Sequence, residues 1–500
     1  KYIKFSFNRY RHRNPYMFVL TGAVVIRLLS VYFSEGYIFQ QEHFGIAEPW
    51  PEGAEAESYE YILYQTLHGY WFRMMDWAGL RIPDDHMMLV RLIHAAFSMM
   101  TVLLGYQLAR IAGSEKGSRL AFVLLAFAWL LPLISVRNYA FNLAVPFLVL
   151  AVWLGRLSYR QYRRLSGVAG FFGGIAIALY PYASVYWLLF VVLTLILHGR
   201  WFRFLLLWLG TAIAMYLAGI LLMPGAWNNP AECLSYLVPA YDHWQWALND
   251  RFWAGPLVLV LVLGPPLGFF ILAVFFRLRR DTLRIGLPAL VCLLASVMMK
   301  DQYGLMIVAF PFVVITGSLS WMNQLEKSRW LEKFRPVYYA GLGYFWVFNV
   351  MLMFWFSTLS PRKPVLDAMR FAGRQEEITT LVVNQQGLDR PVLFPAYYAG
   401  KPLKITYITS NEDIDSVALC LSTAPPDQLP AYVMFYGDEN LKQRILDTYE
   451  AVPASGFTGI YRPGFTERML RRWLDTPLSG SVVIYRNDVF YWYQNRKEWN

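Results

Sequence analysis

The sequence predicts an all-α polytopic membrane protein that carries a soluble α/β domain at its C-terminal end. Of the 500 residues, 57% are hydrophobic and only 16% are charged. Apolar runs long enough to cross a bilayer recur as far as residue 358, and the pattern changes after Pro361. This composition argues against a soluble protein. The net charge of +11 does not require a nucleic-acid partner, because basic cytoplasmic loops would account for it.

The apolar runs predict about eleven transmembrane helices within residues 1–359. Proline is expected to split some runs, at Pro181, at Pro265-Pro266 and at Pro311. The expected spans are 15–34, 86–112, 117–136, 138–157, 166–180, 182–198, 201–222, 254–276, 284–299, 303–321 and 336–358.

The distribution of basic residues predicts the orientation of these helices. If residues 1–14 lie in the cytoplasm, the alternate loops that share this side are all basic. The acidic stretch 35–85, the aromatic loop 224–253 and the tail 360–500 then lie outside. We therefore expect a multi-pass membrane protein with a cytoplasmic N-terminus and an external C-terminal domain. The membrane that we expect is a bacterial inner membrane, which would make the C-terminal domain periplasmic.

The tail 360–500 alternates short β-rich runs with helical patterns, which is typical of an α/β domain. It contains no Gly-rich nucleotide-binding motif. Strands are expected at 379–383, 391–397, 403–409, 416–421, 431–436 and 481–485, and helices at 365–378, 439–452 and 465–475.

Four polar features fall on the predicted outer surface. They are Glu42 and Glu48 after the first span, the Arg137-Asn138 turn, Lys300-Asp301 at the end of a span, and the aromatic loop 224–253. Carboxylates beside isolated cations suit a reaction on a lipid-linked phosphate. A carboxylate takes a proton from an attacking hydroxyl, and Arg or Lys offsets the charge of the departing phosphate.

Each feature also has a purely structural interpretation. Acidic residues of outer loops are usually only solvated, and interfacial Trp and Tyr are most often membrane anchors. Arg137 could cap a helix or meet a lipid headgroup, and Lys300-Asp301 could be a local ion pair. His94 lies in an apolar helical pattern typical of a core residue, and the three cysteines show no metal-binding spacing.

Three segments resemble motifs of the GT-C fold mannosyltransferases that use dolichol- or polyprenyl-phosphate-mannose, the group that includes the GPI and ALG enzymes. Residues 39–48 are similar to their first-loop pattern, with Glu42, Phe44 and Glu48 in register and Gln41 where the family has Asp. Residues 91–138 resemble the region that carries the family's outer-turn Arg. Residues 299–304 resemble a Lys-acid motif followed by a downstream Pro.

The resemblance implies a GT-C fold and an inverting glycosyltransferase whose first outer loop carries the catalytic acid. The implied donor is a polyprenyl-phosphate-linked sugar, with mannose as the sugar. The acceptor is a glycan or lipid-linked molecule, membrane lipid surrounds the site, other membrane proteins are possible partners, and no metal or other cofactor is required. The implied catalytic residues are Glu42 and Glu48, and the implied substrate-binding residues are Gln41, His43, Arg137, Asn138, Lys300, Asp301, Tyr303, His243 and Trp244.

Gln41 leaves a second function open, because a glutamine amide cannot take a proton as the family's Asp does. Either Glu42 or Glu48 acts as the base, or the chain is a non-catalytic GT-C-like subunit that binds lipid-linked glycan or scaffolds a membrane complex. A transporter is the least favoured class, because the sequence shows neither inverted repeats nor intramembrane acids.

Overall fold

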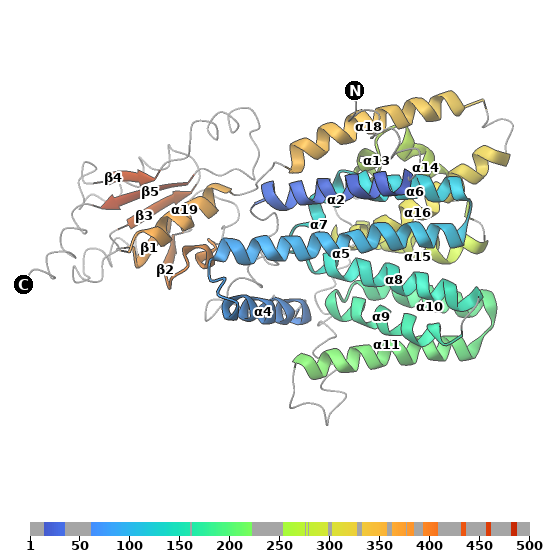
Figure 1. Cartoon of the computed structure of the whole chain (residues 1–500), viewed down its shortest axis with the longest axis horizontal. Coiled ribbons are helices and arrows are strands. Elements are labelled where there is room, and N and C mark those ends of the chain that lie inside the picture. Colours follow the sequence, from blue (N-terminus) through green and yellow to red (C-terminus); the bar gives the residue numbers. More distant parts are fainter. Residues whose placement is uncertain are drawn as a thin grey trace, which may run out of the picture. The chain divides into compact units, whose positions relative to one another are not determined.

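The residues described in the computed structural model form two compact units (Figure 1). The first consists of residues 15–34, 62–78 and 88–357, and the second of residue 35, residues 79–87 and the part of the chain after residue 362. The described residues are 15–35, 62–160, 163–222, 254–275, 277–278, 280–298, 303–327, 333–357, 363–376, 378–384, 394–408, 432–436, 457–461 and 482–487.

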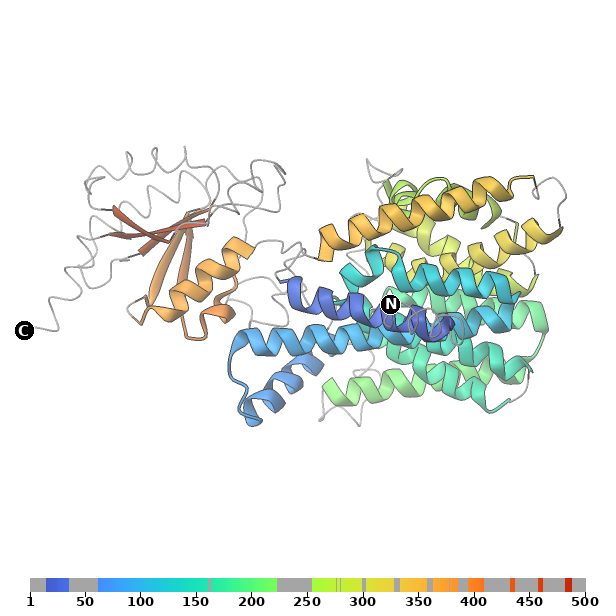
Figure 2. The ribbon, with the colours of Figure 1, turned by 45° about the horizontal axis from the view of Figure 1, so that its top comes forward.

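The first unit is helical, and most of its helices run along a common direction in both views (Figures 1 and 2). Its helices are α2 (Pro15–Phe33), α4 (Ile62–Trp77), α5 (Pro83–Ala112, whose first turn belongs to the second unit), α6 (Glu115–Phe127), α7 (Leu130–Ser135), α8 (Ala140–Arg160), α9 (Leu165–Leu179), α10 (Ala183–His198), α11 (Trp201–Leu222), α13 (Ala254–Leu263), α14 (Leu267–Phe275), α15 (Arg280–Met298), α16 (Tyr303–Lys327) and α18 (Arg335–Ser357).

The predicted class of polytopic helical membrane protein is confirmed. Each expected span coincides with one helix or a broken pair of helices, within a few residues at either end. Among the residues that the structure describes, five helices are long and apolar enough to cross a membrane, and three shorter helices are apolar. The longer helices lie at Tyr16–Phe33, Pro83–Ala112, Ala140–Ser158, Trp201–Leu221 and Gly304–Lys327.

Helix α4 corrects the expectation that residues 35–85 form an acidic loop throughout. Its buried face consists of Leu63, Tyr64, His68 and Met75, which recur at helical spacing, and it packs against α9 and α11. The polar residues interleaved with this face conceal the pattern in the sequence. Helix α4 does not belong to the apolar helices that could span a membrane.

Proline divides the helices less often than expected. The run 254–276 breaks at Pro265-Pro266 into α13 and α14 as expected, but Pro311 lies inside the continuous helix α16. Helix α16 is central, with 94% of its apolar window buried. Neighbouring side chains can satisfy the backbone groups that an intramembrane proline frees.

The run 117–136 breaks between α6 and α7, and side chains from two other helices hold the break. The fully buried Arg27 of α2 donates through Nη1 to the carbonyl of Ala126, at 3.2 Å, and through Nε to Ser98 Oγ, at 2.9 Å. Asn349 of α18 accepts from the amide of Trp129 at 2.9 Å. These contacts satisfy backbone groups that a broken helix would otherwise leave unpaired inside the bilayer.

Glycines bring α9 and α11 into close contact. A methyl group on Gly170 would overlap the carbonyl of Leu207, and one on Gly210 would overlap the carbonyl of Gly167. Small residues at such positions let two membrane helices approach until their backbones touch.

The second unit contains an α/β sheet. Helix α19 (Lys363–Arg374) is followed by β1 (Thr380–Asn384), η4 (Ala396–Ala399), β2 (Lys404–Ile408), β3 (Tyr432–Tyr436), β4 (Phe457–Tyr461) and β5 (Val482–Asn487). The strand order is β2-β1-β3-β5-β4, in which β1 pairs in parallel with β2 and β3, and β5 pairs antiparallel with β3 and β4.

Two expectations for this unit need correction. The strand expected at 391–397 is wrong where the chain is described, because residues 394–395 are irregular and Ala396–Ala399 is a 3-10 turn. Strand β4 was not expected. The strand expected at 416–421 and the helices expected at 439–452 and 465–475 lie outside the described residues.

Candidate functional site

The predicted outer turn Arg137-Asn138 is the part of the candidate site that the structure describes in full. Both residues lie between α7 and α8 and are buried, with Arg137 2% exposed and Asn138 9% exposed. Tyr303 is the first residue of α16, and only its backbone is described. The other predicted site residues lie outside the described residues: Gln41, Glu42, His43, Glu48, His243, Trp244, Lys300 and Asp301.

Local hydrogen bonds give the Arg137 turn its shape. Helix α7 ends at Ser135, and the amide of Arg137 donates back to the carbonyl of Ile134 at 2.9 Å. The side chain of Asn142, in the first turn of α8, donates to the carbonyls of Ile134 and Arg137 at 2.6 and 2.7 Å. One amide group thus holds both sides of the turn, and the chain reverses within four residues.

His94 of α5 holds the same turn from a different helix. Its Nδ1 lies 2.9 Å from the carbonyl oxygen of Arg137. Because a carbonyl can only accept, Nδ1 carries the proton and Nε2 is an acceptor. The hydroxyl of Tyr64, in α4, lies 3.4 Å from Nε2 and can donate to it. The prediction that His94 is a satisfied core residue is confirmed, and the contact adds that it fixes the Arg137 backbone.

His68 extends this polar cluster along α4. Its Nδ1 donates to the carbonyl of Tyr64 at 2.7 Å, and its ring packs edge-on against His94 with centroids 5.3 Å apart. Burial, reinforced by the nearby His94, lowers the pKa of His68 to about 3, although the hydrogen bond to Tyr64 opposes the shift. His68 is therefore neutral at physiological pH.

Apolar contacts bring the end of α2 to the Arg137 turn. Val31 at the end of α2, Ala95 of α5 and Val136 form one buried cluster, and Val136 precedes Arg137 directly. The first predicted motif begins a few residues after Val31. The end of α2 and the Arg137 turn therefore lie at the same end of the helical unit.

Contacts at the start of α16 bring Gly304, the last residue of the third predicted motif, to this end as well. A methyl group built on Gly304 would lie 3.4 Å from Phe141 and would overlap the hydroxyl of Tyr180. Phe141 is at the start of α8, with its ring 4.9 Å from that of Tyr139, directly beyond the turn. The first turn of α16 thus lies near the start of α8, directly after the Arg137 turn.

This geometry suits the binding of an anionic group. A guanidinium withdrawn from water interacts more strongly with a phosphate than an exposed one does, because less solvent screens it. The contacts of His94 and Asn142 fix the main chain from which the Arg137 side chain extends.

Comparison with solved structures identifies the fold. ArnT from Cupriavidus metallidurans, bound to undecaprenyl phosphate, aligns with a TM-score of 0.59 over 94% of this chain and 98% of its own, at 13% sequence identity. The fold is GT-C-like. The apo state of ArnT aligns equally well, with a TM-score of 0.59 over 94% of this chain and 97% of its own, also at 13% identity.

The archaeal oligosaccharyltransferase AglB from Archaeoglobus fulgidus, in complex with an inhibitory peptide and a dolichol-phosphate, aligns with a TM-score of 0.48. That match covers 91% of this chain and 74% of AglB at 12% identity. Because this score is below 0.5, the fold assignment rests on ArnT. No family model matches the sequence, and a search of curated proteins finds no match.

The structure adds residues that the sequence reasoning missed. Asn142, Tyr64 and His68 support the Arg137 turn, and Arg370 of α19 forms an ion-pair network in the second unit. His68 had no clear signal, because His43 and His68 are too scattered in the sequence to suggest a metal site. No sequence signal connects Arg370 to its partners, because more than 280 residues separate it from the nearer of its distant carboxylates.

Proposed function

We propose that this protein is a membrane glycosyltransferase that moves a sugar from a polyprenyl-phosphate carrier to an acceptor, with inversion at the anomeric carbon. The observation that carries the proposal is the alignment with ArnT over nearly the whole of both chains. The ArnT structure holds undecaprenyl phosphate, and we infer that this chain uses a carrier of that class. Mannose as the donor sugar follows from the motif resemblance.

In the proposed reaction, a hydroxyl oxygen of the acceptor attacks the anomeric carbon on the face opposite the phosphate. The bond between this carbon and the phosphate oxygen breaks, and polyprenyl phosphate leaves with the electron pair. Glu42 takes the hydroxyl proton, and Glu48 supports it. Gln41 stands where the related enzymes have Asp, and its amide can hydrogen-bond to a substrate but cannot take a proton.

Cations balance the charge that develops on the departing phosphate. Arg137 supplies a buried guanidinium from a turn that His94 and Asn142 fix. Lys300 supplies a second cation from the segment that leads into α16. Asn138, Asp301, Tyr303 and His43 are proposed to border the phosphate and sugar, and His243 and Trp244 to border the acceptor. The proposed mechanism needs no metal or other cofactor.

We further propose that residues 1–359 form the membrane domain, with outer loops at 35–85 and 224–253, and that residues 360–500 form a periplasmic domain. The proposed location is a bacterial inner membrane with a cytoplasmic N-terminus. The proposed partners are the lipid-linked donor, a glycan or lipid-linked acceptor and membrane lipid. Basic residues in the alternate loops support this orientation.

The binding test uses undecaprenyl phosphate and the purified protein in detergent. Losing a charge-assisted hydrogen bond costs about 1.5–3 kcal/mol, so Arg137→Gln should weaken binding by about tenfold or more. Arg163→Gln is the matched control, because Arg163 is exposed in the turn before α9. Equal affinities for wild type and Arg137→Gln would remove Arg137 from the carrier site.

The catalytic test follows the release of undecaprenyl phosphate from undecaprenyl-phosphate-mannose, with a membrane lipid extract as the source of acceptor. Wild type should release the carrier, and Glu42→Gln should abolish release. Wild-type rates in Glu42→Gln would remove Glu42 from the mechanism. A wild type that binds the carrier, releases none from any polyprenyl-phosphate sugar and co-purifies with other membrane subunits would instead establish the non-catalytic alternative.

A further inference from the structure

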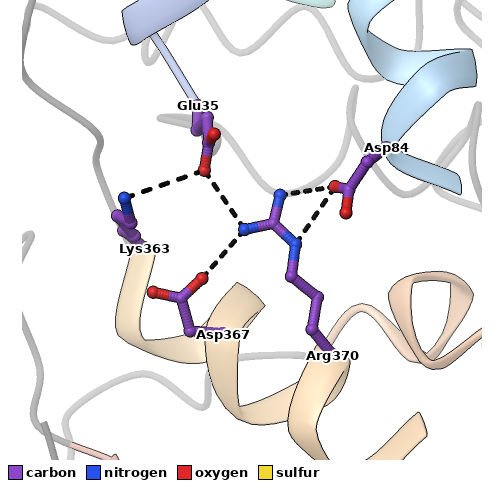
Figure 3. A network of polar contacts seen from close by, with 5 residues as sticks. All are labelled: Glu35, Asp84, Lys363, Asp367 and Arg370. Atoms are coloured by element: carbon purple, nitrogen blue, oxygen red, sulfur yellow. Dashed lines mark hydrogen bonds and ion pairs between the residues drawn. The ribbon is translucent and has the colours of Figure 1, made fainter. Parts of the chain in front are cut away.

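Arg370 of α19 binds carboxylates from three separate places in the chain (Figure 3). Its Nη1 lies 3.1 Å from Glu35 Oε2 and 2.8 Å from Asp367 Oδ1. Its Nε lies 3.1 Å from Asp84 Oδ1, which Nη2 also contacts. Glu35 follows the end of α2, Asp84 lies in the first turn of α5, and Asp367 is one turn earlier in α19. All four residues belong to the second unit.

The geometry of this network requires an arginine. A planar guanidinium presents donors along several edges, so Arg370 meets three carboxylates at once, whereas a lysine ammonium is a single point charge. The Arg370 side chain is only 18% exposed. Although burial acts to lower its pKa, the hydrogen bond and charge of Asp84 and the charge of Glu35 raise it. This is therefore more than an exposed surface ion pair.

A second contact holds the same first turn of α5 and the residues just before it. The Nε2 of His86 donates to the carbonyl of Leu80, which leaves Nδ1 to accept from the hydroxyl of Tyr397 at 2.6 Å. His86 is buried, and Tyr397 lies in η4, directly against α19. Residues 80–86 are thus fixed by two side chains from the tail, Arg370 and Tyr397.

Glu35 and Asp84 mark the two ends of the segment 36–83. This segment begins with the motif that contains Glu42 and Glu48, the proposed catalytic carboxylates. One guanidinium therefore connects the point where the chain leaves α2 to the point where it enters α5 (Figure 3). Glu35 precedes Glu42 by seven residues in the sequence, so Arg370 holds the chain shortly before the first proposed carboxylate.

We propose that Arg370 is a positioning residue for glycosyl transfer, which acts by holding Glu35 and Asp84 together at the base of the first outer loop. This inference rests on the proposed function. It assigns the tail a role in the reaction without placing Arg370 in contact with substrate. Small errors in the placement of a catalytic group are costly, since a displacement of about 1 Å can lower a rate by about a hundredfold.

The experiment compares Arg370→Gln, Arg370→Lys and Asp84→Asn in the purified full-length protein, using carrier release from undecaprenyl-phosphate-mannose. Arg370→Gln should lower kcat by between about tenfold and a hundredfold, with the KM for the donor nearly unchanged. Arg370→Lys should recover only part of the loss. The double variant Arg370→Gln/Asp84→Asn should have a kcat no lower than that of Arg370→Gln alone, because the two residues form one contact. Arg374→Gln, an exposed change on the same helix, is the matched control.

The outcomes separate positioning from stability alone. A folded Arg370→Gln protein with wild-type kcat would overturn the proposal. So would a variant in which Tm falls while kcat per folded molecule stays the same, because Arg370 would then serve only stability. A wild-type protein that releases no carrier from any polyprenyl-phosphate sugar would refute the proposed function itself, an outcome distinct from a loss confined to the Arg370 and Asp84 variants.

Discussion

Replacing His94 with Phe should weaken carrier binding without any change to a residue that touches the carrier. The carbonyl of Arg137 accepts from three donors: the amide of Tyr139 at 2.9 Å, Asn142 Nδ2 at 2.7 Å and His94 Nδ1 at 2.9 Å. Phenylalanine removes the third donor and the contact between Nε2 and the Tyr64 hydroxyl, while the carbonyl keeps two donors. Losing a hydrogen bond costs about 0.5–1.5 kcal/mol, which corresponds to between about two- and 13-fold if it is expressed in binding.

Two further variants identify which nitrogen of His94 matters. His94→Asn places an amide donor near the position of Nδ1, and His94→Gln places one near Nε2. Affinity for undecaprenyl phosphate should be highest in the wild type, lower in His94→Asn, and lowest in His94→Gln and His94→Phe, which should bind equally. Thermal unfolding in detergent is measured in parallel. Tyr64→Phe removes only the contact with Nε2 and should have the smallest effect. Equal affinities for the Asn and Phe variants would refute the role of the Nδ1 hydrogen bond.

Three other predictions concern packing, pH and orientation. Gly210→Ala should lower Tm, because the added methyl overlaps a carbonyl of α9, whereas Gly343→Ala should be neutral because nothing lies within 4 Å. The pKa of about 3 for His68 predicts lost stability as pH falls below about 6.5, where the unfolded chain gains a proton that the folded chain refuses. A His68→Gln protein should lose less stability between pH 6.5 and 4 in acid-unfolding measurements. Because Cys233 lies in the proposed outer loop 224–253, the orientation test uses a Cys233→Ser protein. A membrane-impermeant maleimide added to spheroplasts should label Cys420 in the proposed outer domain and not Cys292, which is buried in α15; labelling of Cys420 only after lysis would reverse the orientation.

The membrane helices could be predicted because their signal is local. A run of about 20 apolar residues has few alternatives to a helix inside lipid. The break between α6 and α7 also has a local signal in the sequence, which is Pro132. Pro132 cannot donate to the carbonyl of Ala128 and would clash with it, so a helix running through both residues is disfavoured. The break lies at Ala128 and Trp129.

Pro311 shows where the same local argument fails. A proline inside an apolar run predicts a break, yet α16 continues through it. This helix is surrounded by α6, α14 and α15, so packing on its sides holds it together. Whether a proline ends a helix thus depends on neighbours that a single sequence does not show.

The candidate site was predictable only in part, for a related reason. The position of Arg137 followed from a short polar turn between two apolar runs. Its partners did not follow, because His94 contacts it across 43 residues and Tyr64 contacts His94 across 30. A hydrogen bond between distant segments leaves no spacing pattern in one sequence. The amphipathic helix α4 was concealed similarly, because its buried face includes His68.

The buried Arg27 has a consequence for how the protein is made. An arginine at the centre of a lone membrane helix costs about 2.5–3.5 kcal/mol during insertion. Its carbonyl partner on Ala126 is 99 residues further along the chain, which a ribosome adding about 5–20 residues per second reaches after roughly 5–20 s. For that interval α2 is a poor lipid-facing helix. The order of synthesis thus favours an α2 that stays beside the insertion machinery until α6 emerges.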